Sequence, residues 1–186
     1  MGAFVTSPVP FSPPAMYPEP LVQPMREELT RLGVEELRDA AAVDRAWEQA
    51  QEGTTLAVVN SVCGCAAANA RPAVALARQA PVQPDRYVTV FAGQDTEATA
   101  QARAHLVGIP PSSPFFALLK DGEPVFVVER RHIEGRSASA IATDLVRAFE
   151  AHCGEGASGD GAPGRPDVSE ARPEDRGLPS TFRSIL

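Results

Sequence analysis

The chain has 186 residues, of which 44% are hydrophobic and 22% are charged, and its formal net charge is −7. This length suits one domain with additional segments, and the negative charge argues against a nucleic-acid-binding protein. The three cysteines are too few for a disulfide framework.

Prolines and glycines are concentrated at the two ends of the chain. Residues 1–24 contain seven prolines, and residues 154–186 combine four prolines and six glycines with many charged residues. Segments of this composition cannot bury enough apolar surface to offset the entropy that is lost when they become ordered. We therefore expect residues 1–16 and 154–186 to be disordered tails on either side of one ordered domain.

The sequence predicts neither a signal peptide nor a membrane span. Residues 1–14 contain no basic residue and are interrupted repeatedly by proline. No stretch approaches the ~20 apolar residues that a transmembrane helix needs. We therefore expect a cytoplasmic protein without a membrane partner, in which cysteines stay reduced unless they perform redox or metal chemistry.

Helices and short apolar strands alternate through the central part of the chain. The spacing of apolar residues and the residues at the ends predict helices over 24–33, 34–51, 66–80, 96–107 and 137–152. Short apolar runs predict strands over 54–60, 87–92, 115–120 and 125–129, the last two joined as a hairpin. We expect Pro72 to kink its helix and Asp95 to cap the helix that follows it. The order predicts an α/β fold with a mixed sheet that is covered on both faces.

Cys63 and Cys65 lie between the predicted strand 54–60 and the helix that follows it. Unpaired N–H groups and the positive end of the helix dipole lower the pKa of a thiol at such a junction, and the thiolate is the species that attacks a disulfide. Gly64 leaves little bulk between the two sulfurs, so an incoming sulfur can reach Cys63. A disulfide that spans one residue would be strained and easily reduced. This pattern favours thiol–disulfide exchange over a pair of inert buried cysteines.

A metal site is the alternative use of the cysteines. Cys63 and Cys65 could form a zinc site together with His152 and Cys153. The Cys-x-Cys spacing is shorter than the usual C-x₂₋₄-C, however, and an adjacent His-Cys pair fits one tetrahedron poorly. Cys153 is more simply explained as a residue at the end of a helix than as a third redox thiol. A metal-binding or redox-sensing module is therefore a second hypothesis.

A proline-rich loop, residues 110–114, precedes the predicted strand 115–120. Pro114 is a candidate for a cis peptide bond that leaves the backbone of Ser113 exposed beside the sulfurs for a substrate to pair with. From composition alone an ordinary loop is the simpler interpretation. The charged residues 130–134 are expected to form a solvated turn without a catalytic role.

The segment Asn60-Ser61-Val62-Cys63-Gly64-Cys65-Ala66-Ala67, with Ala70-Arg71-Pro72 after it, resembles the bacilliredoxin family of thioredoxin-like proteins. The resemblance continues in residues 21–29, 89–95, 111–114, 131–135 and 151–153, and it covers residues 17–153. It implies a thioredoxin-like three-layer fold, in which helices flank a mixed central sheet.

The resemblance also implies a function and a site. The function is a thiol–disulfide oxidoreductase that removes bacillithiol from S-bacillithiolated proteins, with bacillithiol as a co-substrate and with no bound cofactor or metal. Cys63 matches the nucleophile, Cys65 the resolving cysteine, and Pro114 the cis-proline, so that Gly64, Ser113 and Pro114 would bind the substrate. Phe115 departs from the small polar residue expected after this proline, and we expect it to alter the surface offered to substrates. A general protein disulfide isomerase would use the same residues and is the closest alternative.

Overall fold

The computed structural model describes residues 15–154 and 163–167. Its centre is a five-stranded sheet with the strand order β1-β3-β2-β4-β5. Strand β3 runs parallel to β1 and β2, whereas β4 is antiparallel to both of its neighbours, β2 and β5. The strands are β1 (Glu35–Glu36), β2 (Thr54–Asn60), β3 (Arg86–Phe91), β4 (Phe115–Lys120) and β5 (Glu123–Val128).

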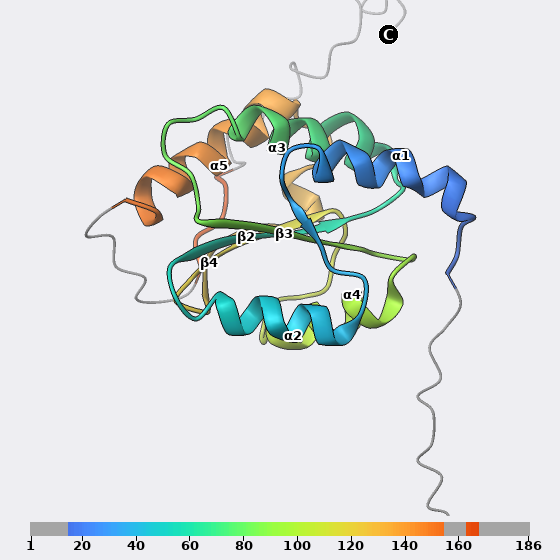
Figure 1. Ribbon diagram of the computed structural model, residues 1–186. Helices are drawn as coiled ribbons and strands as arrows, with labels where there is room; N and C mark the ends of the chain where they lie inside the picture. Colours follow the sequence, from blue (N-terminus) through green and yellow to red (C-terminus); the bar gives the residue numbers. More distant parts are fainter. Residues whose placement is uncertain (1–14, 155–162, 168–186) are drawn as a thin grey trace, which may run out of the picture.

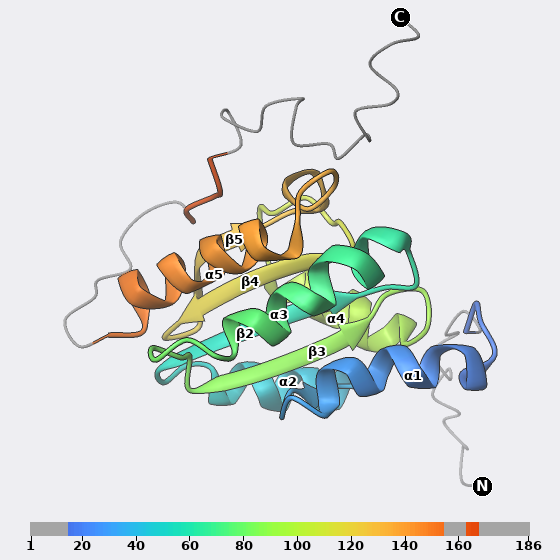
Figure 2. The ribbon, with the colours of Figure 1, turned by 90° about the horizontal axis from the view of Figure 1, so that it is seen from above.

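Helices cover both faces of this sheet (Figures 1 and 2). One layer contains α1 (Glu19–Thr30), α3 (Arg71–Ala77) and α5 (Ala138–His152), and the opposite layer contains α2 (Ala40–Gln49) and α4 (Thr96–His105). This arrangement confirms the expected thioredoxin-like three-layer α/β fold. Within the described ranges, no helix combines the length and the apolar character needed to cross a membrane.

Strand β2 lies at the centre of the fold and is buried along its whole length. Leu56 and Val58 belong to the core under α1, α3 and α5, whereas Ala57 and Val59 belong to the core under α2 and α4. Successive side chains of a strand point to opposite faces, so a strand covered on both sides favours apolar residues on both faces. This explains the apolar run over residues 56–59 in the middle of the strand.

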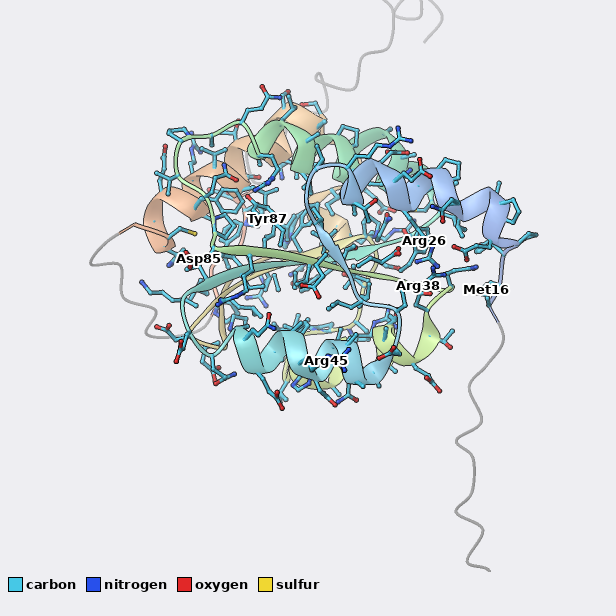
Figure 3. The ribbon with its side chains drawn as sticks, in the orientation of Figure 1. Met16, Arg26, Arg38, Arg45, Asp85 and Tyr87 are labelled. Atoms are coloured by element: carbon cyan, nitrogen blue, oxygen red, sulfur yellow. The ribbon has the colours of Figure 1, made fainter. Side chains whose placement is uncertain are left out.

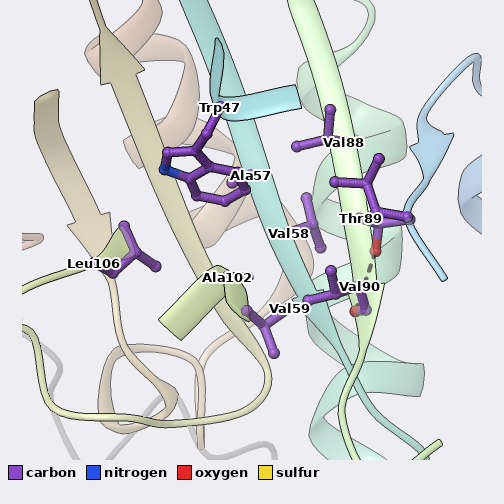
Figure 4. A pocket seen from close by; sticks show the side chains of 10 residues that line it. Trp47, Ala57, Val58, Val59, Val88, Thr89, Val90, Ala102 and Leu106 are labelled. Carbon is purple, nitrogen blue, oxygen red and sulfur yellow. Dashed lines mark hydrogen bonds between the residues drawn. The ribbon is translucent and has the colours of Figure 1, made fainter. Parts of the chain in front are cut away.

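A cavity of about 10 Å³ lies in the core between the sheet and the α2–α4 layer (Figure 4). Trp47, Ala57 and Leu106 are among the residues around it. Trp47 Nε1 is buried without a hydrogen-bond partner among the described residues, and its ring stacks on His105 with 5.2 Å between the ring centroids. The cavity is about the size of one water molecule and is too small for a substrate.

The predicted helix over residues 34–51 is wrong in its first part. Glu35 and Glu36 instead pair with Val88 and Thr89 as a short parallel strand. The helix α2 begins only at Ala40, after Asp39, whose side chain accepts a hydrogen bond from the Ala42 N–H at 2.7 Å. A strand of two residues is too short to show any periodicity. The start of α2 does have a signal in the sequence, because aspartate is favoured at the N-cap of a helix.

The region after the cysteines differs from the predicted kinked helix. Ala66–Ala70 form a π-helical turn, η1, and α3 starts at Arg71 with Pro72 in its first turn. Helical residues run without a break over 64–77, and the Arg71 N–H donates to the Ala66 carbonyl, so Pro72 lies within a helix directly after the π-helical turn. Asp95 also differs from its expected role, since its side chain does not cap α4 and instead pairs with Arg26 at 2.6 Å.

Residues 163–167 fall within the segment that was expected to be disordered, but they lie along the outer edge of β5. The Gly164 N–H donates to the Val125 carbonyl, and the Val127 N–H donates to the Gly164 carbonyl, both at 2.8 Å. Arg165 Nε also donates to Glu129 Oε1 at 3.0 Å. Backbone pairing with an open sheet edge does not depend on an apolar side chain, which is why composition failed to predict it. The rest of the two predicted tails, apart from residues 15, 16 and 154, lies outside the described residues.

Replacing Gly164 by proline tests this edge contact. Proline has no N–H and therefore cannot donate to the Val125 carbonyl, so we expect residues 163–167 to separate from β5. The Val127 amide should then exchange with deuterium about tenfold faster, whereas amides of β2 should keep their protection. Unchanged exchange at Val127 would show that the contact does not protect this strand edge in solution.

Candidate active site

Two segments that are far apart in the sequence meet at one edge of the sheet. Strands β2 and β4 are antiparallel, with Val59 opposite Phe115. The cysteines follow the end of β2, and Ser113 and Pro114 immediately precede β4, so both segments lie at the same edge. The Ser113–Pro114 peptide bond is cis, as predicted.

The two cysteines are close together and accessible. Both are free thiols, both are partly exposed, and their sulfurs lie 2.7 Å apart. Gly64 between them is exposed, and no atom lies within 4 Å of the place where a Cβ would stand. A sulfur that approaches from this side therefore meets no described side chain at Gly64.

The surroundings of Cys63 favour its thiolate form. Burial raises the pKa of Cys63, but hydrogen bonds from Cys65, Ser61 and the Ala66 N–H more than offset burial, so the pKa lies below its ordinary value. Ser61 Oγ lies 3.2 Å from the Cys63 sulfur, and the positive charge of Arg130 acts in the same direction. Cys63 thus has the lowered pKa of a nucleophilic cysteine.

Cys65 has the opposite tendency. Burial raises the pKa of Cys65, and both its hydrogen bond to Cys63 and the charge on that thiolate raise it further. Of the two thiols, Cys63 therefore loses its proton at the lower pH. This division suits a reaction in which one cysteine attacks first and the other acts in a second step.

The turn after β5 is part of the site, although the sequence suggested only a solvated corner. The Arg130 N–H donates to Ser112 Oγ at 3.3 Å, next to the cis peptide bond. From the helical turn after the cysteines, Asn69 Nδ2 donates to the Ile133 and Arg136 carbonyls at 3.3 and 2.5 Å. These contacts connect the turn both to the proline-rich loop and to the helical turn after the cysteines. Nothing in the local sequence distinguishes this turn from an ordinary charged turn.

Arg71 contacts the segment that leads into the cysteines, which the sequence does not predict. Its side chain is 3% exposed, and its Nε donates to Glu28 Oε2 at 2.7 Å. Its Nη1 donates to Asn60 Oδ1 and to the Ser61 carbonyl at 3.2 and 3.1 Å. An arginine in the first turn of an alanine-rich helix was the only available signal.

Cys153 is far from the other two cysteines. It lies at the end of α5 and interacts with Thr54, at the start of β2, whereas Cys63 and Cys65 follow the other end of that strand. The seven residues of β2 span about 20 Å. The structure therefore contradicts a zinc site made from Cys63 and Cys65 together with His152 and Cys153, and the described part of the chain contains no cluster of metal ligands. Burial raises the pKa of Cys153, as is typical of an unreactive thiol.

The expected effect of Phe115 on the substrate surface is also wrong. Its side chain is 2% exposed and packs with Ala117 and Leu119 in the core under α2 and α4. Phe115 is the first residue of β4, and successive side chains of a strand point to opposite faces of the sheet. The side chain of Phe115 lies on the face that is covered by α2 and α4.

A thioredoxin-like fold with two neighbouring cysteines, one of lowered and one of raised pKa, and with a cis-proline at the same end of the sheet defines a thiol–disulfide oxidoreductase. The chain belongs to the family described as disulphide isomerase, whose model matches residues 17–153, and its relatives there are bacilliredoxins. Two bacilliredoxins of Salinibacter ruber are 63% and 56% identical to it, each alignment covering 91% of this chain and 98% of the relative. One from Koribacter versatilis is 51% identical, over 75% of this chain and 95% of the relative.

Among solved structures, the thioredoxin of Schistosoma mansoni shares 20% identity with this chain, with a TM-score of 0.43. That alignment covers 62% of this chain and 97% of the thioredoxin. The thioredoxin of Malassezia sympodialis shares 16% identity, with a TM-score of 0.42, and the alignment covers 65% of this chain and 91% of that one.

Proposed function

We propose that this protein removes bacillithiol from S-bacillithiolated proteins, with Cys63 as nucleophile and Cys65 as resolving cysteine. The observation that carries the proposal is the pair of sulfurs 2.7 Å apart, in which the pKa of Cys63 is lowered and that of Cys65 is raised. The relatives named bacilliredoxin support bacillithiol as the small thiol. The reaction would take place in the cytoplasm and would need no bound cofactor.

The reaction has two exchanges. The Cys63 thiolate attacks the bacillithiol sulfur of the modified protein, the protein thiolate leaves, and bacillithiol is held in a mixed disulfide with Cys63. Cys65 then loses its proton and attacks the Cys63 sulfur, which releases bacillithiol as a thiolate and forms a Cys63–Cys65 disulfide. Alternatively a free bacillithiol attacks the bound one and leaves as its disulfide, with Cys63 regenerated as a thiolate.

Gly64, Ser113 and Pro114 have supporting roles in this proposal. Gly64 leaves the approach to Cys63 open, because no side chain projects there. Ser113 is half-buried at the sheet edge that carries the cysteines, and its backbone would pair with an extended substrate segment. Pro114 is buried and immediately precedes β4, which begins at Phe115.

The direct test is a Cys63→Ser variant challenged with a bacillithiolated protein. A serine hydroxyl is not ionised at neutral pH, so removal of bacillithiol should fall by about a thousandfold or more. Mass spectrometry of the substrate measures the loss of the bacillithiol adduct over time. Undiminished removal by the variant would contradict the assignment of the nucleophile.

A general disulfide isomerase is the second candidate, and the description of the matching family favours it. It would use the same cysteines but act on scrambled disulfides between protein cysteines. The two functions are separated by comparing the rates of the unaltered protein on a bacillithiolated protein and on a scrambled, disulfide-containing one. A faster reaction with the scrambled protein would favour the isomerase.

A further inference from the structure

The buried guanidinium of Arg71 is the starting point. A charged side chain that is 3% exposed is costly to keep out of water unless its donors are all engaged. Only one of its hydrogen bonds is to a carboxylate, Glu28, and that residue lies in the outer helix α1. The other two are to Asn60 Oδ1 and to the Ser61 carbonyl, in the segment that leads directly into Cys63.

Ser61 is thereby held on both sides. Its N–H donates to Asn60 Oδ1 at 2.8 Å, and its carbonyl accepts from Arg71 Nη1 at 3.1 Å. Asn60 is itself fixed, because its Nδ2 donates to the Met25 carbonyl of α1 at 3.3 Å. Both peptide groups that flank the Ser61 Cα are therefore hydrogen-bonded, one to the Asn60 side chain and the other to Arg71. These hydrogen bonds fix the backbone from which the Ser61 side chain projects.

The hydroxyl of Ser61 points to the reacting sulfur. Its Oγ lies 3.2 Å from Cys63 Sγ, and the residue is 7% exposed, so water has little access as a competing partner. A thiolate carries no proton, so in the reactive state only the serine O–H can be the donor. A thiol or disulfide sulfur is a much weaker acceptor, and the hydrogen bond therefore stabilises the thiolate selectively.

We propose that Ser61 is a catalytic residue whose hydroxyl donates to the Cys63 thiolate, and that Arg71 is a positioning residue that acts through Ser61. The proposal rests on Cys63 as the nucleophile of the proposed function. It predicts a particular dependence of rate on pH, because a lower thiol pKa gives more thiolate but makes each thiolate a weaker nucleophile.

The Ser61→Ala variant tests the role of Ser61 as a hydrogen-bond donor to Cys63. All comparisons use a Cys65→Ser, Cys153→Ser background, so that Cys63 is the only thiol of the chain. The pKa of Cys63 is measured from the pH dependence of its alkylation by iodoacetamide, and loss of the hydroxyl should raise it by about one unit. Below both pKa values the variant should react about threefold more slowly, and above both about threefold faster. Ser61→Thr keeps the hydroxyl and should restore the original pKa.

A double-mutant cycle tests whether Arg71 acts through Ser61. Arg71→Met keeps much of the side-chain volume but removes every donor, and it should raise the pKa of Cys63 when Ser61 is present. In the Ser61→Ala protein the same change should add nothing further, because the two residues act in one chain of contacts. Arg78→Met is the matched control: Arg78 follows the last residue of α3, away from the cysteines, with its Nε on the Leu32 carbonyl, and its loss should leave the pKa of Cys63 unchanged.

Each half can be overturned separately. An unchanged Cys63 pKa in Ser61→Ala would remove Ser61 from the mechanism, and additive effects in the cycle would show that Arg71 acts by its own charge. If Arg71→Met does not fold, Arg71→Lys replaces it: a raised pKa with the positive charge retained supports positioning, and an unchanged pKa contradicts it. Iodoacetamide needs no bacillithiol, so these outcomes are independent of whether the proposed substrate is correct.

Discussion

The Cys65→Ser variant is expected to accumulate a mixed disulfide between Cys63 and bacillithiol. The first exchange needs only Cys63, whose pKa is already lowered, so the first turnover should proceed. The second exchange loses the thiol that stands 2.7 Å from the bonded sulfur. Because a neighbouring group reacts at a far higher effective concentration than a free thiol, release of bacillithiol from Cys63 should slow by about a hundredfold. Mass spectrometry of the intact variant, stopped with acid, measures the adduct of one bacillithiol.

The Cys153→Ser variant is the matched control for this experiment. Cys153 lies at the end of α5, beside the start of β2, and should not affect either exchange. Free bacillithiol added in excess should restore turnover of the Cys65→Ser variant, because an external thiol can attack the same mixed disulfide. If bacillithiol leaves Cys63 of the variant as fast as it leaves the original protein, without added thiol and with no adduct accumulating, Cys65 is not the resolving cysteine.

The position of Cys63 and Cys65 between an apolar strand and a helix could be predicted from sequence because its determinants are local. A Cys-Gly-Cys segment between an apolar strand and a helix brings its own N–H groups, and the Ala66 N–H indeed lowers the pKa of Cys63. The supporting residues could not be predicted in the same way. Arg130 acts on the cysteines through its charge, from a turn that lies far away in the sequence, and Arg71 donates to the Ser61 carbonyl just before them.

The same distinction applies to the fold. Strand β2 and helix α5 follow continuous apolar patterns and were predicted nearly to the residue. Strand β1 and residues 163–167 are held by backbone pairing to strands that lie far away in the sequence. Backbone groups are alike in every residue, so such pairing leaves no trace in composition or periodicity.

Replacing Arg26 by methionine is expected to cause the largest loss of stability. Arg26 is 2% exposed and forms ion pairs with Glu19, Glu36 and Asp95 at 2.8, 2.6 and 2.6 Å. It thus joins α1 to β1 and to the start of α4. Figure 3 labels Arg26 next to Arg38. Methionine would leave three carboxylates together without their main counter-charge, at a cost of about 3–5 kcal/mol in the free energy of unfolding. Urea denaturation at neutral pH measures this loss.

The dependence on pH separates this explanation from a simple packing defect. Burial raises the pKa of Glu19, but hydrogen bonds from Arg26 and Gln94 and nearby positive charges more than offset it, so the pKa of Glu19 is lowered. A lowered folded-state pKa stabilises the protein above the unfolded pKa of about 4.3, and this contribution is lost as the pH falls through the folded value. The difference between the original protein and Arg26→Met should therefore shrink in acid, whereas a packing defect would persist.

Arg45 provides the matched control, since it is an exposed arginine on α2 (Figure 3). Arg45→Met should change the free energy of unfolding by less than about 0.5 kcal/mol at any pH. A loss below about 1 kcal/mol in Arg26→Met would mean that the ion pairs only balance the cost of burying their charges. In that case the junction of α1, β1 and α4 would depend on its apolar contacts, such as those of Leu37 and Val88 in the core beneath it.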